Sequence, residues 1–204
     1  TIDQAALDIG RHVAELIRDG DCLQVGIGGV PNAILAALHD RNDLGIHSGL
    51  VSDGIMALVA TGNITGTNKS VDTGRIVTGT TLGSRKLTDW AGTARQLSFR
   101  PVSYTHDVGV IRQLDNFVSI NSALEVDLFG QVNADMLHGR QQSGTGGSID
   151  MLRAAALSRG GRAIIALKAT AAGDSRSRIV AALSQHTAAT ILRTDVDYVV
   201  TEYG

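Results

Sequence analysis

The feature that most constrains the fold is a glycine-rich turn between a short apolar segment and a helical pattern near the start of the chain. Leu23–Val25 predicts a buried strand, and the turn Gly26–Val30 follows it directly. Pro31 stands where helices favour proline, in the first turn, and Ala33–Leu38 continues a helical pattern. A strand, a glycine turn and a helix in this order are typical of α/β folds.

The rest of the chain alternates between strand-like and helix-like patterns. Residues 3–19 place apolar side chains at spacings of three and four, which predicts an amphipathic helix ending at Gly20. In the middle third, Ala123–Asp127 and Gln131–Asn133 indicate a hairpin turning at Gly130. We therefore expect an α/β fold with an open, mostly parallel sheet flanked by helices and some antiparallel additions. The remaining predictions are strands at Ile46–Val51, Ile76–Thr81, Val108–Ile111, Asn116–Asn121, Ala163–Leu167 and Tyr198–Thr201, and helices at Asp53–Ala60 and Ile149–Leu157.

Length and composition narrow the class of protein. A chain of 204 residues suits one domain, residues 1–204, because domains cluster near ~100–150 residues. The net charge of −2 argues against a nucleic-acid partner, and the longest apolar runs fall far short of the ~20 residues of a membrane span. Cys22 is the only cysteine, which excludes an internal disulfide and fits a reducing cytoplasm. Because Thr1 has no preceding Met, we expect a fragment or a processed chain.

Two glycine turns, Gly26–Val30 and Gly144–Gly147, each precede a predicted helix. Backbone N–H groups at a helix start can hold a phosphate or a developing oxyanion. The first turn is a poor dinucleotide-binding fingerprint, because Pro31 takes the place of the third glycine, and no Gly-Lys-Ser/Thr makes it a P-loop. On these patterns alone, glycines that serve only tight strand-to-helix turns remain an equal alternative.

Longer motifs resemble a known family over essentially the whole chain. These motifs are GIGGVPNA at 26–33, LGIHS at 44–48 with SDG at 52–54, INSALEVDL at 120–128, GQVN at 130–133 and DVDYVVTEYG at 195–204. Together they resemble the C-terminal domain of the acetyl-CoA hydrolase/transferase family, the group of the 4-hydroxybutyrate and acetate CoA-transferases.

The resemblance implies an open α/β domain, the second of two similar domains, with the active site between them and the N-terminal-type domain outside this chain. In the family a glutamate attacks the acyl-CoA thioester and later carries CoA to an incoming carboxylate, which is nucleophilic covalent catalysis. The resemblance further implies acyl-CoA as substrate, no metal, a small carboxylate as partner and a homo-oligomer, with neither nucleic acid nor membrane. The CoA contacts that it implies are Gly26, Ile27, Gly28, Gly29, Val30, Gly146 and Gly147, with Thr170 and Arg193 as additional contacts.

One position departs from the family in a way that matters for chemistry. The residue after His47-Ser48 is the family's nucleophilic glutamate, and here it is Gly49. Glycine has no atom that could form an anhydride or a thioester, so the covalent route is closed unless another residue supplies a carboxylate. Near the second turn, Ser148 replaces a usual Gln and Met151 a usual Phe, which puts the shape of the substrate in question.

The residues that could compensate for Gly49 are few. Glu125 and Glu202 are carboxylates of the right type, but a structural role, through backbone hydrogen bonds or an ion pair, is the stronger expectation for both. His47 and Ser48 adjoin the position, yet neighbours in a strand point to opposite faces, so a direct dyad between them is poor geometry. Asp53 is expected to be a cap or turn residue, like Asp127.

The other histidines give no sign of a metal site, because they are scattered without ligand spacing: His12, His39, His106, His138 and His186. Three functions remain open at this point. The chain belongs to an acyl-CoA enzyme of the transferase or hydrolase class, it is a CoA-binding or scaffold domain that has lost its chemistry, or it is a repurposed site that transfers acyl groups non-covalently from a CoA or carrier-protein thioester.

Overall fold

A seven-stranded sheet forms the centre of the computed structural model, which describes residues 3–204. Its strands are β1 (Cys22–Val25), β2 (Gly45–Val51), β3 (Ile76–Thr81), β4 (Leu97–Phe99), β5 (Phe117–Asn121), β10 (Arg162–Ala166) and β14 (Tyr198–Val200). In space they follow the order β14-β10-β5-β1-β2-β3-β4, and every neighbouring pair is parallel. The expected open parallel sheet is confirmed.

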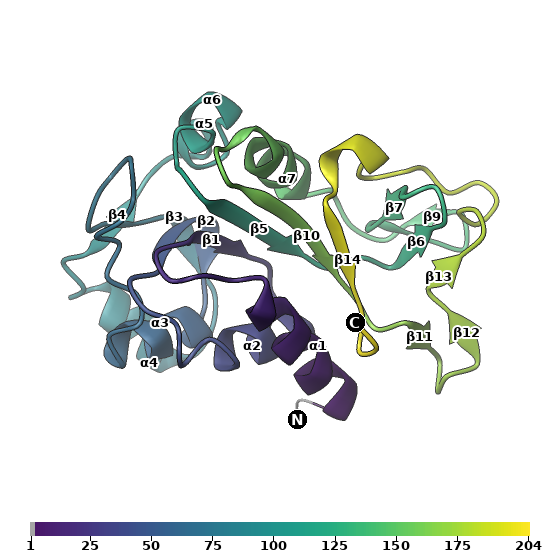
Figure 1. The fold of residues 1–204 in the computed structure, drawn as a ribbon, viewed down its shortest axis with the longest axis horizontal. Coiled ribbons are helices and arrows are strands. Elements are labelled where there is room, and N and C mark those ends of the chain that lie inside the picture. The colour runs from purple at the N-terminus through teal and green to yellow at the C-terminus, as the bar shows by residue number, and fades with distance from the viewer. Residues whose placement is uncertain (1–2) are drawn as a thin grey trace.

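Helices cover both faces of this sheet (Figure 1). One face carries α1 (Gln4–Glu15), α2 (Gly29–Ala36), α3 (Asp53–Ala60) and α4 (Arg85–Ala91), and the other carries α5 (Val102–Thr105), α6 (Val108–Ile111) and α7 (Ser148–Leu157). A 3-10 turn, η1 (Arg193–Asp195), precedes β14. Helix α1 packs along α2, so the first two helical segments form one layer.

Short strands lie beyond β14 at one end of the molecule (Figure 1). The strands β6 (Glu125–Asp127) and β7 (Val132–Asn133) pair antiparallel around Gly130, which confirms the expected hairpin, and β13 (Ile179–Val180) adds to β6 in parallel. Two further antiparallel pairs join β8 (Met136–Leu137) to β9 (Arg140–Gln141) and β11 (Thr170–Ala171) to β12 (Arg176–Ser177).

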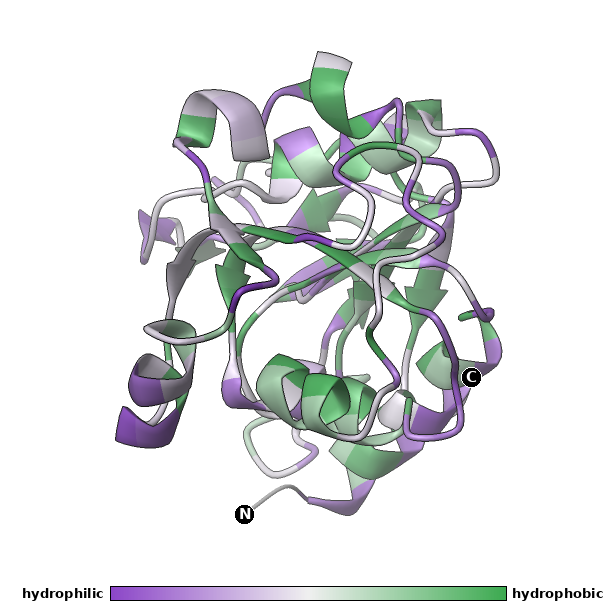
Figure 2. Cartoon of the chain, turned by 90° about the vertical axis from the view of Figure 1, so that its left-hand side faces the viewer, coloured by the Kyte–Doolittle hydropathy of each residue, from purple (hydrophilic) through white to green (hydrophobic). Residues whose placement is uncertain are grey.

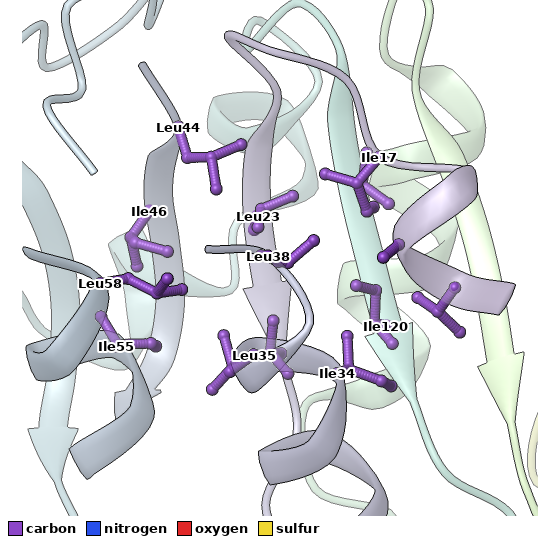
Figure 3. Packing of buried hydrophobic residues seen from close by; sticks show 14 of the residues in the cluster. Ile17, Leu23, Ile34, Leu35, Leu38, Leu44, Ile46, Ile55, Leu58 and Ile120 are labelled. Carbon is purple, nitrogen blue, oxygen red and sulfur yellow. The ribbon is translucent and has the colours of Figure 1, made fainter. Parts of the chain in front are cut away.

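The core has one cluster on each face of the sheet. On the α1–α3 face, Ile34 and Leu35 of α2 and Leu38 in the turn after it pack in one cluster with Leu23 and Ile46 on the strands (Figure 3). On the α6–α7 face, the buried side chains come mainly from β5, β10 and α7, and they include several alanines. In Figure 2 hydrophobic colour is common on the strands and on the helices beside them, and hydrophilic colour gathers on the peripheral turns.

Most expected elements are confirmed, with two differences. Helix α1 begins after Asp3, whose side chain accepts a hydrogen bond from the Ala6 N–H at 3.1 Å, and it ends at Glu15, earlier than Gly20. The strand expected at Val108–Ile111 is wrong, because this segment forms helix α6. Its branched residues favour a strand, but Asp107 accepts a hydrogen bond from the Val110 N–H at 3.0 Å and caps a helical turn instead.

No helix among residues 3–204 is long and apolar enough to cross a bilayer. The longest helix, α1, has 12 residues.

Candidate active site

The sheet reverses its winding between β1 and β5. From β1 the chain runs outward through β2, β3 and β4, then returns to β5 on the other side of β1 and continues to β10 and β14. Connections on the two sides leave the sheet toward opposite faces, so a crevice opens at the carboxyl ends of β1 and β5. The Gly26 N–H donates to the Ile120 carbonyl at 3.0 Å, which joins the two strand ends at the bottom of this crevice.

A cavity of about 370 Å³ occupies this crevice, and we call it the switch-point cleft. Both glycine turns reach it, together with the end of β2 and one residue from the loop after α5. Its walls are Gln24, Val25, Gly26, Ile27, Ser48, Gly49, Leu50, Thr80, His106, Asn121, Gly146, Gly147, Ser148 and Met151. Segments far apart in the sequence are therefore brought together around Gly49, at the position where open α/β sheets bind ligands.

The floor of the cleft is a buried polar network. The Asn121 Nδ2 and the Ser119 hydroxyl donate to Gln24 Oε1 at 2.9 and 2.6 Å, and Gln24 Nε2 lies 3.3 Å from Asn121 Oδ1. These bonds fix both amides at the ends of β1 and β5. The pairing of Gln24 with Asn121 depends on the contact between β1 and β5, so the sequence around either residue does not predict it.

The first glycine turn leads directly into α2. Gly28 caps this helix with a φ of 120°, a left-handed conformation that side chains disfavour. The first N–H groups of a helix have no partner within it, so those of Gly29 and Val30 are available to an anion. A second cavity of about 530 Å³ lies over this turn, lined by Ile27, Gly28, Asn32, Ser52, Asp53, Gly54, Leu82 and Gly83. Since Ile27 lines both cavities, the helix start adjoins the switch-point cleft.

The second glycine turn also opens a helix. Gly146 has a φ of 58° and Gly147 caps α7, whose N-terminus faces the cleft at Ser148. The positive end of α7 is thus directed toward the cavity, where it would favour negative charge. Ser148 and Met151 of α7 line the same cavity as Gly146 and Gly147.

The space beside Gly49 is filled by a histidine. A Cβ atom built on Gly49 would lie 2.6 Å from Cε1 and 2.8 Å from Nε2 of His106. A Cβ atom on Gly147 would lie 2.2 Å from Nε2 of the same ring. The imidazole of His106 therefore occupies a slot that exists because positions 49 and 147 both lack side chains.

His106 is a second residue of the cleft that the sequence did not predict. It was grouped with histidines that show no ligand spacing, and nothing local distinguishes it. His106 directly follows helix α5, which packs against β2 and β3, and this packing brings the ring to the cleft. The signal that could have found it is the loss of a side chain at Gly49, which requires a neighbour to fill the space.

His47 and Ser48 differ in what they reach. The His47 ring is fully buried beside Tyr104 and Phe117, while Ser48 lines the cleft and its hydroxyl accepts a hydrogen bond from the Leu50 N–H at 3.3 Å. Burial, together with the nearby charge of Lys69, lowers the pKa of His47 to about 4, so its imidazole is neutral near neutral pH. His47 is thus placed to support the site rather than to touch a ligand in it.

Thr170 and Arg193 line neither of these cavities. Thr170 stands in β11 and donates to Asp174 at 2.5 Å, while Arg193 lies in η1 beside a separate cavity of about 440 Å³. The structure brings the two glycine turns and Gly49 together, and it leaves Thr170 and Arg193 apart from them.

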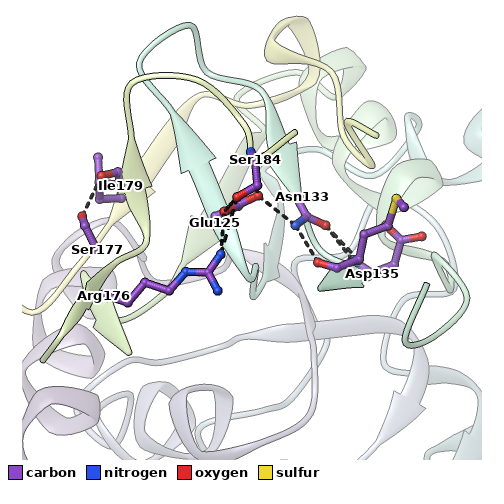
Figure 4. A network of polar contacts seen from close by, with 8 residues as sticks. Glu125, Asn133, Asp135, Arg176, Ser177, Ile179 and Ser184 are labelled. Carbon is purple, nitrogen blue, oxygen red and sulfur yellow. Dashed lines mark hydrogen bonds and ion pairs between the residues drawn. The ribbon is translucent and has the colours of Figure 1, made fainter. Parts of the chain in front are cut away.

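The two candidate glutamates have partners away from the cleft. Glu125 accepts from Asn133 Nδ2 at 3.2 Å and from the Ser184 hydroxyl at 3.0 Å, and Arg176 lies 3.7 Å away (Figure 4). Glu202 accepts from the Ala169 N–H at 2.8 Å. Both carboxylates hold loops together, as the structural expectation for them proposed, and neither lines the switch-point cleft.

Two other acidic residues act locally. Asp53 accepts from the Ser84 N–H at 2.9 Å, and Asp127 accepts from the N–H groups of Phe129 and Gln131 at 3.0 and 2.9 Å. The bonds of Asp127 fit the expected turn role. Asp53 does not cap its own helix, whose N-cap is Ser52; it instead joins the start of α3 to Ser84 at the start of α4. Within the described residues, no three His, Cys, Asp or Glu side chains gather as they would around a metal ion.

Known proteins resemble this chain over nearly all of it. It is 45% identical to the 4-hydroxybutyrate coenzyme A transferase of Clostridium kluyveri over 96% of this chain and 46% of that protein. It is 41% identical to the succinyl-CoA:cyclohexane-1-carboxylate CoA transferase of Geobacter metallireducens, again over 96% of this chain and 45% of that protein. The chain spans about half the length of these curated relatives.

Solved structures agree with the sequence matches. RipA from Yersinia pestis superposes with a TM-score of 0.94 at 38% identity, covering 100% of this chain and 46% of that one. The 4-hydroxybutyrate CoA-transferase of Porphyromonas gingivalis superposes with a TM-score of 0.87 at 40% identity, covering 99% and 47%. The model of the acetyl-CoA hydrolase/transferase C-terminal domain matches residues 83–204. By sequence and by fold, this chain belongs to the acetyl-CoA hydrolase/transferase family.

Proposed function

We propose that this domain supplies the acyl-CoA site of a CoA-transferase or acyl-CoA hydrolase acting on short-chain carboxylates, and that the site works without a glutamate nucleophile. The observation that carries the proposal is Gly49, which stands in a cleft walled by both glycine turns yet offers no reactive atom. Relatives named for 4-hydroxybutyrate, cyclohexane-1-carboxylate and butyryl-CoA support a carboxylate and its CoA thioester as the ligand class.

In this proposal the two glycine turns bind different parts of the acyl-CoA. The turn Gly26–Val30 and the start of α2 bind CoA phosphates through backbone N–H groups, and Gly146-Gly147 approaches the thioester. Thr170 and Arg193 stay in the proposal as outlying CoA contacts. An N-terminal-type domain of the intact protein completes the site, a homo-oligomer is the expected assembly, and a reducing cytoplasmic location is consistent with the free, buried Cys22.

Two alternatives rest on the same glycine. The domain could bind CoA as an inactive scaffold, or it could transfer acyl groups non-covalently from a CoA or carrier-protein thioester. Activity separates them, because a scaffold binds CoA without consuming any thioester, and a repurposed site consumes a carrier-bound one in preference.

Binding is tested first, by thermal unfolding of the intact protein with and without CoA. A ligand at ~100 times its dissociation constant stabilises the native state by about 2.7 kcal/mol, which is visible as a melting shift. Gly29→Glu places a negative charge at the start of α2, where no described atom lies within 4 Å of the new Cβ, and should abolish the shift. Gly92→Glu adds the same charge at the exposed end of α4 and should leave it intact.

Turnover is tested next, with short-chain acyl-CoAs and with a phosphopantetheine carrier thioester. Release of CoA from the former, lost in Gly29→Glu and retained in Gly92→Glu, supports the proposed enzyme. A CoA-dependent shift without turnover of any thioester identifies a scaffold and refutes catalysis. Absence of both binding and turnover refutes the proposal as a whole.

A further inference from the structure

The imidazole of His106 takes the place where a side chain at position 49 would begin. Its ring edge lies between two backbones, with Cε1 turned to Gly49 and Cδ2 to Gly147, and any Cβ at either position would collide with it. The ring is partly exposed and lines the switch-point cleft. A titratable group therefore stands at the position from which a reactive carboxylate is missing.

Hydrogen bonds set the orientation of this ring. Nδ1 of His106 lies 2.8 Å from the Thr105 hydroxyl, and that hydroxyl lies 3.5 Å from the Pro101 carbonyl oxygen. The 2.8 Å contact fits either direction of donation. When Nδ1–H donates to the hydroxyl and the hydroxyl donates to the Pro101 carbonyl oxygen, all three groups have a partner. In this tautomer Nε2 carries the lone pair, on the edge of the ring between Gly49 and Gly147.

The backbone beneath the ring is held from the other side. The Thr105 carbonyl oxygen accepts a hydrogen bond from Nε2 of the buried His47 at 3.2 Å. Thr105 thus joins a buried imidazole on β2 to the imidazole at the cleft. This arrangement, a base whose second nitrogen is oriented by another group, is the geometry that acid–base catalysis requires.

We propose that His106 is the general base of a thioester hydrolysis in the switch-point cleft, a role that rests on the proposed acyl-CoA function. Nε2 removes a proton from a water molecule while the water oxygen bonds to the thioester carbon, and the carbonyl electron pair moves to oxygen. The N-terminal N–H groups of α7 face the cleft and favour that negative charge. The intermediate then reforms its carbonyl and breaks the carbon–sulfur bond, and the leaving thiolate takes the proton from the imidazolium. The products are a carboxylic acid and CoA.

The imidazole beside Gly49 favours hydrolysis of the thioester over transfer of CoA. An imidazole in place of a carboxylate cannot form the anhydride and glutamyl thioester of a CoA transfer, but it can activate water. The reaction needs no acceptor carboxylate and leaves no acyl group on the chain. The structure thus points to water as the acceptor at this site.

The test compares three substitutions in the intact protein, with short-chain acyl-CoAs as substrates and release of the CoA thiol as the measure. His106→Gln should lower the rate by about 100-fold or more, the usual contribution of a general base, while the CoA-dependent melting shift is unchanged. His106→Ala should lose the same activity and regain part of it with added imidazole. His39→Gln, which removes an exposed histidine outside the cleft, should act like the wild type.

Isotope labelling completes the test. In ¹⁸O-labelled water, hydrolysis by the wild type should place one label in the acid, and mass spectrometry should find no acyl or CoA adduct on the protein. A His106→Gln rate near that of the wild type, turnover that requires a carboxylate acceptor, or an acyl group trapped on His106 would each overturn the role of His106 while leaving the acyl-CoA function standing. Failure of the wild type to bind or consume any acyl-CoA would instead refute the proposed function.

Discussion

His47 donates a hydrogen bond from Nε2 to the carbonyl oxygen of Thr105 at 3.2 Å, and this bond ties the last residue of α5 to strand β2. A carbonyl cannot donate, so the proton sits on Nε2 and Nδ1 is left as an acceptor. Nδ1 is buried and has no hydrogen-bond partner among the described residues. The imidazole can therefore stay in this position only while it is neutral.

Acid should destabilise the protein through His47. Its pKa is lowered to about 4 in the folded chain, first by burial and then by the charge of Lys69, against about 6.5 in an unfolded chain. Between these values the unfolded chain binds a proton that the folded chain does not, so the free energy of unfolding is greatest above pH ~6.5 and falls as the pH drops toward ~4. The full loss amounts to about 3 kcal/mol.

This dependence can be measured by thermal unfolding at pH ~7.5 and ~5. His47→Gln keeps a donor for the Thr105 carbonyl but cannot titrate, so its melting temperature should change less between the two pH values than that of the wild type. His39→Gln removes an exposed histidine and should retain the wild-type difference. Equal pH dependence in His47→Gln and the wild type would show that His47 is not the source.

A glutamate at position 49 should work only when His106 is removed as well. Gly49→Glu alone places its Cβ 2.6 Å from the His106 ring, so the new carboxylate and the imidazole compete for one slot. Gly49→Glu with His106→Ala clears that slot, and we expect transfer between acetyl-CoA and short carboxylates together with a CoA adduct on the protein. Mass spectrometry after incubation with acyl-CoA detects the adduct, and His106→Ala alone is the control. Adduct formation by the single Gly49→Glu variant at the same rate would contradict the competition.

Gly161→Ala should destabilise the turn between α7 and β10. A Cβ at this position would lie 2.1 Å from the Ala155 carbonyl oxygen and 2.9 Å from that of Phe117, and backbone atoms cannot rotate away as a flexible side chain does. We expect a loss of about 2 kcal/mol or more, measured by urea unfolding. In the matched variant Gly92→Ala the nearest atom is 3.6 Å away, and little change is expected. Equal stability of the two variants would show that the turn can shift.

Asp21→Asn should lower the free energy of unfolding more than the loss of an exposed ion pair does. Asp21 and Arg162 are both buried, and Arg162 Nη2 pairs with Asp21 across the amino ends of β1 and β10. Arg162 Nε has no hydrogen-bond partner among the described residues. Burial raises the pKa of Asp21, and the charge of Arg162 opposes that rise. Removing the carboxylate leaves a buried guanidinium charge unpaired, at a cost of about 3 kcal/mol or more in the free energy of unfolding.

The control for this change is an exposed pair. Asp115→Asn removes the partner of Arg159, whose side chain is 85% exposed, and should change the free energy of unfolding far less than Asp21→Asn does. A double variant, Asp21→Asn with Arg162→Met, should recover part of the lost stability because no charge remains buried. If the double variant were no more stable than Asp21→Asn, the unpaired charge would not be the cause.

The sequence predicts the sheet well because the deciding signals are local. Gly26–Val30 between an apolar run and Pro31 is enough to indicate a strand, a turn and a helix, and α3 and β3 have the predicted bounds. Val108–Ile111 was mispredicted because one side chain outside the segment, Asp107, decides between strand and helix. Short segments depend on such single contacts, and residue preferences alone do not settle them.

In the candidate site, too, the residues in continuous motifs were predicted and those that depend on distant contacts were not. Gly49 and both glycine turns were found from motifs, since each motif is continuous in the sequence. His106 and Gln24 were missed because their roles come from contacts across the sheet, with β2 in one case and with β5 in the other. Neither contact leaves a pattern in the residues next to them.

The slot between Gly49 and Gly147 also bears on how this protein can change over time. The His106 ring fills the space in which a side chain at position 49 would begin, so a glutamate introduced there meets an occupied position. Under the proposed function, an unobstructed carboxylate at position 49 requires two substitutions, and a chain with either one alone has neither that carboxylate nor the intact imidazole arrangement. The glycine at position 49 is in this sense entrenched by the ring beside it.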